Sequence, residues 1–547
     1  MRSLVLGRFR VYGQRCLLLL AAATPLVFHR ASLDVFNLTK ISTALVLTLC
    51  AAVLWVVWSA ERGIWLPRVR ALIPAGLLLL TLSLAAAGSQ NKAVSFLGLY
   101  RRYGGLASVA IYGLILVLVV AFFWENPQDL RRLAWANALA SVLVAVYVLF
   151  QAAGQDWIRW TGVDGVSPEY PLGTLGNSNF AGGYLAMSVP YLVYLMISAK
   201  RQLVRFALAI CATVAGLGVW FTGSRAAILA AGAALGFLAL AHRHLIPRWT
   251  KVAAVSAATL GVLVAVAVLW HPWSTRPPAP LAELDVFRTS SFEARTYYWA
   301  AGWRMFRHRP LLGSGPDSYF ANYTRFRLPA DGAELGLHVT DRPHSIFLEY
   351  AVGGGIGALG SFLLLLVWPL WLGWQRLKAL EGPERALVAC LMAVLVAYIV
   401  QGAFSIDVPP LAVTAWMAIG ALAAVADPKA ISARTAIGQL RQGKRGPKRT
   451  RNQSPTDNLE VVAVTRRLTG AGKPVVQLAG LILAAAVLFS GLKPFVADVY
   501  ARYGINSNSR LSPEAFNPGP FLKAIKLNPA EPTYHTLAGQ SALAGAI

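Results

Sequence analysis

One polar stretch separates the hydrophobic runs of this chain. Residues 271–345 have the sequence HPWSTRPPAPLAELDVFRTSSFEARTYYWAAGWRMFRHRPLLGSGPDSYFANYTRFRLPADGAELGLHVTDRPHS, with nine arginines, no lysine and four of the chain's eight histidines. The planar guanidinium group of arginine pairs with two phosphate oxygens at once, whereas lysine offers a point charge. The stretch therefore indicates an anionic ligand such as a phosphate or diphosphate. Its seven acidic residues also allow the alternative of an ordinary solvated loop.

The composition on both sides of this stretch is that of a membrane protein. Of the 547 residues, 56% are hydrophobic and only 14% are charged, which excludes an ordinary soluble protein. Since a spanning helix needs roughly 20 apolar residues, we predict an all-α polytopic membrane protein with about 12–13 transmembrane helices. The predicted helices lie at about 16–28, 41–58, 71–87, 105–124, 133–153, 180–198, 206–222, 226–241, 252–270, 346–372, 386–404, 410–426 and 475–492.

The first apolar run follows a basic flank and has two interpretations. It is either a signal peptide or an uncleaved first helix. We favour the uncleaved helix because Pro25 to Phe28 continue the apolar run.

The distribution of basic residues predicts the orientation in the membrane. With the N-terminus inside, nearly all the inside loops are rich in lysine and arginine, so the positive-inside rule explains much of the net charge of +26 without nucleic acid. This orientation makes 271–345 a large periplasmic loop of a membrane domain at 1–426. Lys92, Arg101 and Arg102 lie on the outer side against the rule, as interfacial anchors or as contacts to lipid phosphate.

The chain after the membrane domain has three predicted parts. Residues 427–474 form a basic, disordered cytoplasmic linker, 475–492 form the last transmembrane helix, and 493–547 form a periplasmic tail. The tail resembles part of one tetratricopeptide repeat and is a candidate docking site for a protein partner. Because a single repeat cannot bury its own apolar face, we expect the full gene product to continue beyond Ile547.

Two candidate sites on the outer face carry an arginine. Ser224 and Arg225 precede a predicted helix at its outer end, where an arginine either binds an anion or anchors the helix at the interface. Arg295 and Trp299 belong to SFEARTYYWAAGWRMF, whose aromatic residues recur at helical spacing. This spacing predicts an amphipathic helix on the outer leaflet, aromatic side down, which holds Arg295 at headgroup depth or only anchors the helix.

Two further candidate sites carry a histidine and a carboxylate. His344 directly precedes the 346–372 helix, together with Arg342, and its unperturbed pKa near 6.5 suits a general base. Asp407 lies in the short outer loop FSIDVPP, where it orients a histidine, pairs with an arginine or serves as a turn residue.

The sequence predicts neither a metal site nor a cofactor. The four cysteines fall in apolar runs and are too widely spaced for a zinc motif. The nearest approach to a carboxylate pair is Glu283 with Asp285. Ionisable residues are almost absent from the predicted spans, with Glu349 as the one clear case, which argues against an ion-coupled transporter.

Four motifs, in this order, resemble the O-antigen ligase and O-antigen polymerase family over roughly residues 40–426. The motifs are Gly173–Leu185 (GTLGNSNFAGGYL), Gly223-Ser-Arg225 with Leu229, Arg295-x-x-x-Trp299 followed by Pro310–Gly315 (PLLGSG), and His344-Ser-x-x-Leu348 followed by Gly354 and Gly357.

The resemblance implies a metal-independent, inverting glycosyltransferase in the bacterial inner membrane. Its donor is a glycan on undecaprenyl diphosphate at the periplasmic face. The acceptor is lipid A-core in ligases, another glycan in polymerases, or a protein hydroxyl in O-oligosaccharyltransferases. By the same resemblance, Arg225 and Arg295 bind the diphosphate and His344 activates the acceptor. Supporting residues are Asp407, Ser224, Trp299, Arg342 and Arg102.

Two functions of other classes remain open at this stage. One is a transporter or flippase for a small anion or a lipid-linked sugar, which a transport assay beside a transfer assay distinguishes. The other is a scaffold that recruits partners through the tail, which deletion of residues 493–547 tests.

Overall fold

The computed structural model describes most of the chain. The described residues are 2–62, 65–67, 69–158, 160, 170–242, 290–328, 339–432, 461–463, 472–508 and 517–544. The predicted helix at 252–270, the carboxylates of Glu283 and Asp285, and most of the basic linker lie outside them.

The described residues are helical almost throughout, and the prediction of an all-α fold is confirmed. The described residues also contain two three-residue strands, β1 (Trp65–Pro67) and β2 (Val461–Ala463), which pair in antiparallel fashion. Strand β2 belongs to the segment predicted as linker, so this pairing joins the linker to the loop between the second and third apolar helices.

The apolar helices confirm a multi-pass membrane protein. Nine helices among the described residues are long and apolar enough to cross a membrane, and two more apolar helices are shorter. The long helices are α2 (Asn37–Arg62), α5 (Leu106–Phe123), α6 (Leu130–Ala152), α7 (Ser178–Ile197), α8 (Gln202–Phe221), α15 (Ile346–Leu377), α16 (Gly382–Ala403), α17 (Pro409–Ala426) and α19 (Gly472–Asn508); the shorter ones are α3 (Leu72–Ala87) and α9 (Arg225–Ala241).

The N-terminal helix α1 (Arg2–Leu26) belongs to the same bundle. It contributes Leu17, Leu20 and Ala21 to the main hydrophobic core. The interpretation of this segment as an uncleaved first helix requires such a position in the bundle, and it stays a prediction.

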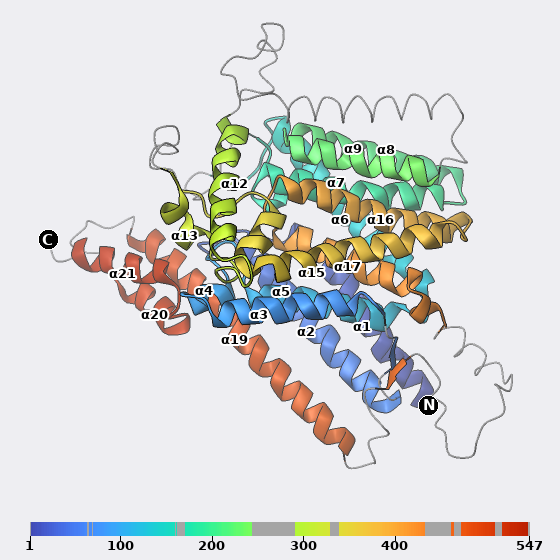
Figure 1. Ribbon diagram of the computed structural model, residues 1–547, viewed down its shortest axis with the longest axis horizontal. Helices are drawn as coiled ribbons and strands as arrows, with labels where there is room; N and C mark the ends of the chain where they lie inside the picture. The colour runs from blue at the N-terminus through green and yellow to red at the C-terminus, as the bar shows by residue number, and fades with distance from the viewer. Residues whose placement is uncertain are drawn as a thin grey trace, which may run out of the picture.

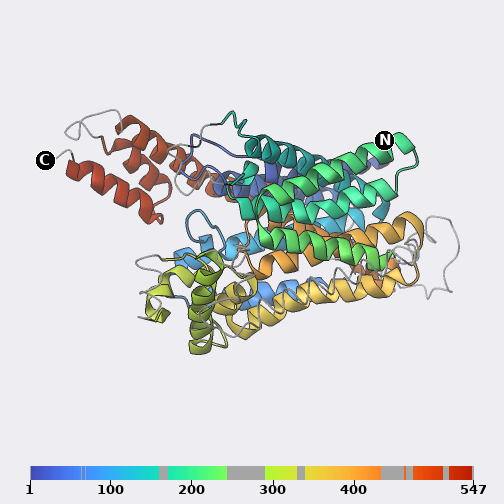
Figure 2. The same cartoon turned by 90° about the horizontal axis from the view of Figure 1, so that it is seen from above.

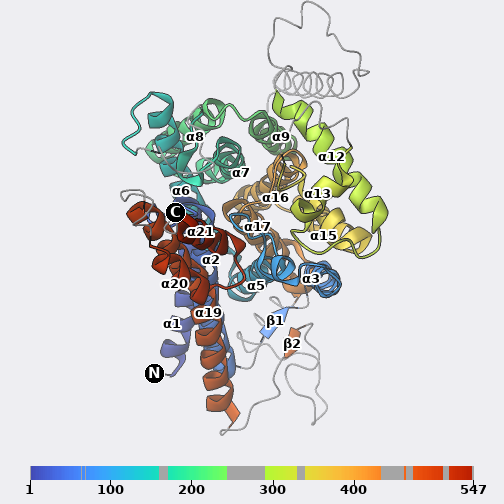
Figure 3. The same cartoon turned by 90° about the vertical axis from the view of Figure 1, so that its left-hand side faces the viewer.

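The long helices lie side by side, and the shorter polar elements gather at one end of the bundle (Figure 1). Helices α12 (Ser290–His308) and α13 (Tyr319–Phe326) lie at this end, and α12 runs across the direction of the long helices. We call this end of the bundle the loop end. Figures 2 and 3 show that the C-terminal helices α20 (Gly519–Leu527) and α21 (Pro532–Ala544) lie at the same end, on the other side of it.

Helix α17 forms the centre of the bundle. All eighteen of its residues, from Pro409 to Ala426, are buried. Small residues allow this close packing, since a Cβ added to Gly420 would lie 2.9 Å from the backbone oxygen of Leu116 on α5. Close approach through small residues is the usual way in which membrane helices associate.

Helix α15 is interrupted where it meets the loop end. Gly354 and Gly355 leave the helical conformation, and Gly355 has a φ of +66°, which favours glycine. The segment Pro310–Gly315 covers the interruption and bonds to the freed backbone groups. Its bonds run from Ser314 N to Val352 O (2.8 Å), from Gly315 N to Gly353 O (3.0 Å) and from Ile356 N to Pro310 O (2.7 Å).

The C-terminal tail packs on the bundle through the end of α19. Helix α19 continues through the predicted boundary at residue 492, so its C-terminal part belongs structurally to the tail. Its residues Ala497 and Ala501 form a hydrophobic cluster with Phe521, Tyr534 and the bundle residue Leu33. Part of the apolar surface of the tail is thus covered by α19 and by Leu33, and the resemblance of the tail to a repeat stays a prediction.

A buried carboxylate ties the tail to two loops of the bundle. Asp498 on α19 accepts hydrogen bonds from Tyr100, from the backbone N–H of Asp34 (2.7 Å) and from Tyr534 (3.1 Å). Asp498 and Lys40 lie outside the predicted spans 475–492 and 41–58 but inside the longer apolar helices of the structure. Lys40 is the fourth residue of α2 and Glu349 the fourth of α15, so both are near helix ends.

We predict that Gly355→Ala destabilises the protein by about 3 kcal/mol, because alanine disfavours this backbone conformation and its Cβ would overlap the loop. A Cβ at Gly355 would lie 2.3 Å from Leu311 O. The control is Gly360→Ala in the same helix, where nothing lies within 4 Å of the added Cβ. The midpoint of thermal unfolding in detergent should fall by several degrees for the first variant and not for the second. Equal midpoints would contradict this account of the interruption.

Candidate functional site

The three residues predicted to carry the chemistry come from separate segments and meet at the loop end. Arg225 is the first residue of α9, Arg295 lies on α12, and His344 precedes α15. Burial and the positive charge of Arg225 lower the pKa of Arg295. Burial and the positive charge of Arg295 in turn lower the pKa of His344. Since each group is within electrostatic reach of the next, the structure brings all three together.

The His344 side chain is neutral at pH 7. Its pKa is lowered to about 4, mainly by burial and then by Arg295, with Arg102 and Arg342 acting in the same direction and Asp341 opposing them. The ring is stacked on Tyr298 of α12, with 5.7 Å between the ring centroids. The backbone of His344 has a φ of +53°, uncommon for a residue other than glycine. A neutral imidazole among arginines can accept a proton once an anion offsets their charge.

Arg102 reaches the same place from the loop before α5. It forms an ion pair with Asp341, three residues before His344. Burial acts to raise the pKa of Asp341, but the charge of Arg102 and its hydrogen bond bring that pKa below its ordinary value. The sequence suggested that Arg102 is an interfacial anchor or a contact to lipid phosphate. Neither interpretation predicted its ion pair with Asp341.

The start of α9 is fixed by the first turn of α7. Ser224 Oγ accepts a hydrogen bond from Ala227 N (3.3 Å) at the helix N-terminus and donates one to Asn179 Oδ1 (2.8 Å). The backbone oxygen of Asn179 accepts a hydrogen bond from the Gln401 side chain of α16 (3.0 Å). Ser224 therefore holds the position of Arg225, and the GNSN sequence contributes through Asn179.

Trp299 connects α12 to the loop between α16 and α17. Its ring contacts that of Phe404, at 6.2 Å between centroids. Arg295 and Trp299 are four residues apart and therefore lie on one side of α12. The aromatic side of α12 faces protein in part, since Tyr298 is buried while Trp303 is 54% exposed. Part of this side therefore packs against protein, and the position of α12 on the outer leaflet stays a prediction.

A buried ion cluster lies beside His344, centred on Arg342. Its guanidinium group pairs with Asp317 Oδ1 (Nη2, 3.0 Å) and Glu349 Oε1 (Nη1, 2.9 Å), and it donates a hydrogen bond to the backbone oxygen of Asp407 (3.3 Å). The Arg342 side chain is only 2% exposed. Burial acts to lower the pKa of Arg342, but the surrounding carboxylates, Asp317 first, raise it above the ordinary value.

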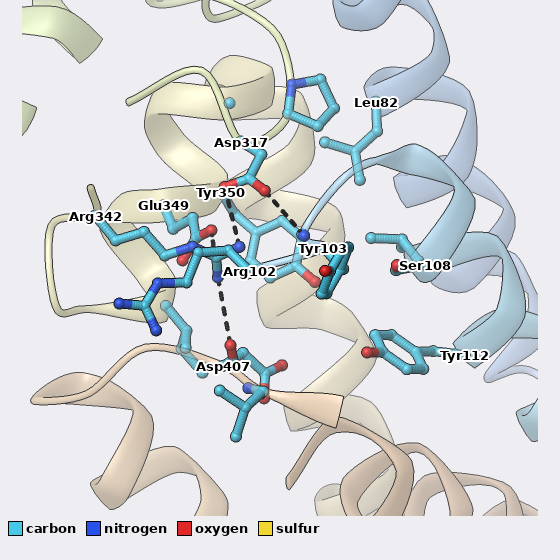
Figure 4. A pocket seen from close by; sticks show the side chains of 16 residues that line it. Leu82, Arg102, Tyr103, Ser108, Tyr112, Asp317, Arg342, Glu349, Tyr350 and Asp407 are labelled. Atoms are coloured by element: carbon cyan, nitrogen blue, oxygen red, sulfur yellow. Dashed lines mark hydrogen bonds and ion pairs between the residues drawn. The ribbon is translucent and has the colours of Figure 1, made fainter. Parts of the chain in front are cut away.

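The carboxylate of Asp407 is held by its own partners. It accepts hydrogen bonds from Tyr398 (2.6 Å) and from Val408 N (3.0 Å), and burial raises its pKa to about 6. The sequence left three alternatives for Asp407. The printed contact with Arg342 is a hydrogen bond to the backbone oxygen of Asp407 and not to its carboxylate, and the described contacts include none with His344. Figure 4 shows Asp407 and Arg342 around a pocket that Arg102 and Glu349 also line.

Asp317 was not singled out in the sequence, and it joins three segments. Besides its pairing with Arg342, its Oδ2 accepts hydrogen bonds from Leu99 N (2.7 Å) and Gly104 N (2.9 Å). These bonds close the loop that carries Arg102, in which Arg101 has a φ of +66°. Asp341 was also missed, although its position next to Arg342 could have drawn attention to it. Nothing in the sequence around Asp317 signals its role.

The comparisons with known proteins agree with the motifs. A family model described as O-antigen ligase matches residues 210–363, a range that contains Arg225, Arg295 and His344. This confirms the resemblance to the O-antigen ligase family and supports a glycosyltransferase of the ligase and polymerase type. No curated protein matches the chain.

We predict that Arg342→Met destabilises the protein by about 3–5 kcal/mol, because it leaves buried carboxylates without their cation. The control is Arg307→Met on α12, where the side chain is exposed. Thermal unfolding of both purified variants measures the effect. If Arg342→Met unfolds at the wild-type temperature, the cluster does not hold this end of the bundle together.

Proposed function

We propose that this chain, which carries the O-antigen ligase domain over residues 210–363, transfers a glycan from undecaprenyl diphosphate to an acceptor hydroxyl. The acceptor is lipid A-core or a similar glycolipid; a growing glycan or a protein hydroxyl would make it a polymerase or an O-oligosaccharyltransferase. The observation that carries the proposal is the meeting of Arg225, Arg295 and His344 at one end of a bundle of apolar helices. Two mutually repelling arginines beside a neutral histidine suit a dianionic donor and a neutral hydroxyl.

In the proposed reaction, Arg225 and Arg295 bind the diphosphate through paired hydrogen bonds. The acceptor oxygen attacks the anomeric carbon of the donor sugar, and its proton passes to the free ring nitrogen of His344. The bond between the anomeric carbon and the diphosphate oxygen breaks, and the electron pair leaves with the diphosphate. Attack opposite the leaving group inverts the anomeric centre. The arginines stabilise the charge that develops on the diphosphate, so the reaction needs no metal ion.

The distribution of charge supports a site on the periplasmic face of the inner membrane. The turns between α7 and α8 and between α15 and α16 lie at the end of the bundle opposite α12, as does the N-terminus (Figure 1). These turns contain the basic segments Lys200–Arg205 and Trp374–Arg385. By the positive-inside rule, that end faces the cytoplasm and the loop end faces the periplasm.

We predict different defects for His344→Ala and for replacement of either arginine. His344→Ala should lower turnover by about 10²–10⁴-fold with donor affinity nearly unchanged, because only proton transfer is lost. Arg225→Lys and Arg295→Lys should weaken donor binding as well as turnover, because lysine does not restore the paired hydrogen bonds. The measurements are transfer from a defined undecaprenyl diphosphate glycan and, separately, donor binding, by purified protein in detergent.

Arg307→Lys, at an exposed position on the same helix as Arg295, is the matched control and should behave as wild type. Near-normal turnover of His344→Ala would remove His344 from the mechanism. Wild-type behaviour of Arg225→Lys would reduce Arg225 to a membrane anchor.

We further predict a pH dependence that changes when the donor binds. The free protein loses the neutral form of His344 only as the pH falls through about 4. A bound diphosphate offsets the arginine charges and raises the pKa of His344, so the acid limb of kcat should lie at higher pH than that of kcat/KM. Asp407, with a pKa of about 6, is the competing group, and Asp407→Asn should leave the His344 limb in place. If the acid limb of kcat disappears in Asp407→Asn, the group that titrates is Asp407 and not His344.

A further inference from the structure

A second pocket lies at the loop end, away from the proposed transfer site. It is formed between α13, the C-terminal end of α12 and the turn before the short helix α4 (Lys92–Leu97). Arg295 and His308 are thirteen residues apart on α12, which separates this pocket from the transfer site by roughly 20 Å along the helix. Polar side chains in its lining include Gln90, Asn91, Arg309, Ser318, Asn322 and Arg325.

Helix α13 turns one polar side toward this pocket. Its Tyr319 and Tyr323 are buried, and Tyr319 donates a hydrogen bond to Tyr298 O on α12 (2.8 Å). With the tyrosines packed against α12, Asn322 and Arg325 are left on the pocket side, three residues apart and therefore on one face. The tyrosine packing thus fixes which side chains line the pocket.

The permanently charged side chains of this pocket are arginines. Arg309, Arg325 and His308 line it, and none of the lining residues is acidic. Arg325 Nη2 lies 3.3 Å from His308 Nε2. Arg309 has no ion-pair partner among the residues that the structure describes. This contrasts with Arg342, whose charge is offset by carboxylates, and it leaves paired donors for a carboxylate or phosphate.

Neutral hydrogen-bonding groups complete the lining. Ser318 is 5% exposed, and its Oγ has no hydrogen-bond partner in the described part of the chain. Asn91 uses its side-chain oxygen to cap α4, with a bond from Val94 N, which leaves its amide N–H groups for other partners. Gln90 adds a further amide, and Asn322 donates one N–H to Ser318 O (2.9 Å) and keeps its second N–H for a ligand. A buried hydroxyl without a partner is costly, and a ligand hydroxyl would satisfy it. Hydroxyl and amide groups in such number match the hydroxyls of a sugar.

We propose that this pocket binds an acidic sugar residue, one that carries a carboxylate or a phosphate group. Arg309 and Arg325 bind the anionic group, while Ser318 and the amides of Asn91 and Asn322 bind the sugar hydroxyls. The assignment of this sugar to a glycan substrate rests on the proposed function, whereas binding itself does not require transfer. The pocket is then a second contact for a glycan chain whose reacting end lies at Arg295 and His344.

The test measures binding of glucuronic acid and glucose 6-phosphate to the full chain in an uncharged detergent, by saturation-transfer NMR titration. Glucose is the neutral control, inorganic phosphate tests the anion alone, and nanodiscs containing phosphatidylglycerol test a lipid headgroup. We expect at least one acidic sugar to bind ten-fold or more tightly than both glucose and inorganic phosphate. The double variant Arg309→Gln with Arg325→Gln should weaken this binding ten-fold or more, and Ser318→Ala should weaken it by a smaller factor.

Two controls separate this proposal from the proposed function. Arg307→Gln, an exposed neighbour that does not line the pocket, should bind the acidic sugar as wild type does. His344→Ala should also bind it normally even if transfer is abolished. Equal binding of glucose and the acidic sugars, or unchanged binding by the double arginine variant, would overturn the proposal. Binding of phosphatidylglycerol that the double arginine variant weakens, without any acidic-sugar binding, would assign the pocket to lipid instead.

Discussion

The pairing of Arg342 with buried carboxylates is the interaction on which the loop end depends. Arg342 lies two residues before His344, Asp317 follows the loop that covers α15, and Glu349 belongs to α15 itself. One buried cation thus connects the segment before α15, the segment before α13 and α15 itself, in addition to the backbone hydrogen bonds between the covering segment and α15. Since a buried charge is tolerated only when it is paired, the cluster forms only when all three segments are in place. The position of His344 is a consequence of this condition.

The same cluster extends to the elements that surround the site. Asp317 also closes the loop of Arg102, and the neighbouring Tyr100 is bonded to Asp498 on α19. The tail is therefore connected to the site by one short loop. The interruption of α15 is connected to the site through the covering segment before Asp317. A tail that could have been only a docking module for partners is packed into the architecture that positions the functional residues.

The sequence was informative wherever the determining pattern was local. Runs of apolar residues predicted the helices because burial in lipid requires such runs, and short motifs indicated Arg225, Arg295 and His344. It was uninformative about contacts between distant residues. Asp317 contacts Leu99 across 218 positions and Asp498 contacts Tyr100 across 398, and neither contact leaves a periodic signal. For the same reason Arg342 and Asp407 were expected only as supporting residues, whereas their charges and hydrogen bonds form the core of the buried cluster.

The central claim is that Arg225 and Arg295 bind one diphosphate, and a double-mutant cycle on donor binding tests it most directly. Donor affinity is measured for wild type, Arg225→Gln, Arg295→Gln and the double variant at one ionic strength. If both side chains hold the same diphosphate, the double variant should lose less binding free energy than the sum of the two single losses, with an interaction of about 0.5–3 kcal/mol. Strictly additive losses would show that the two arginines act independently and would contradict a shared diphosphate site.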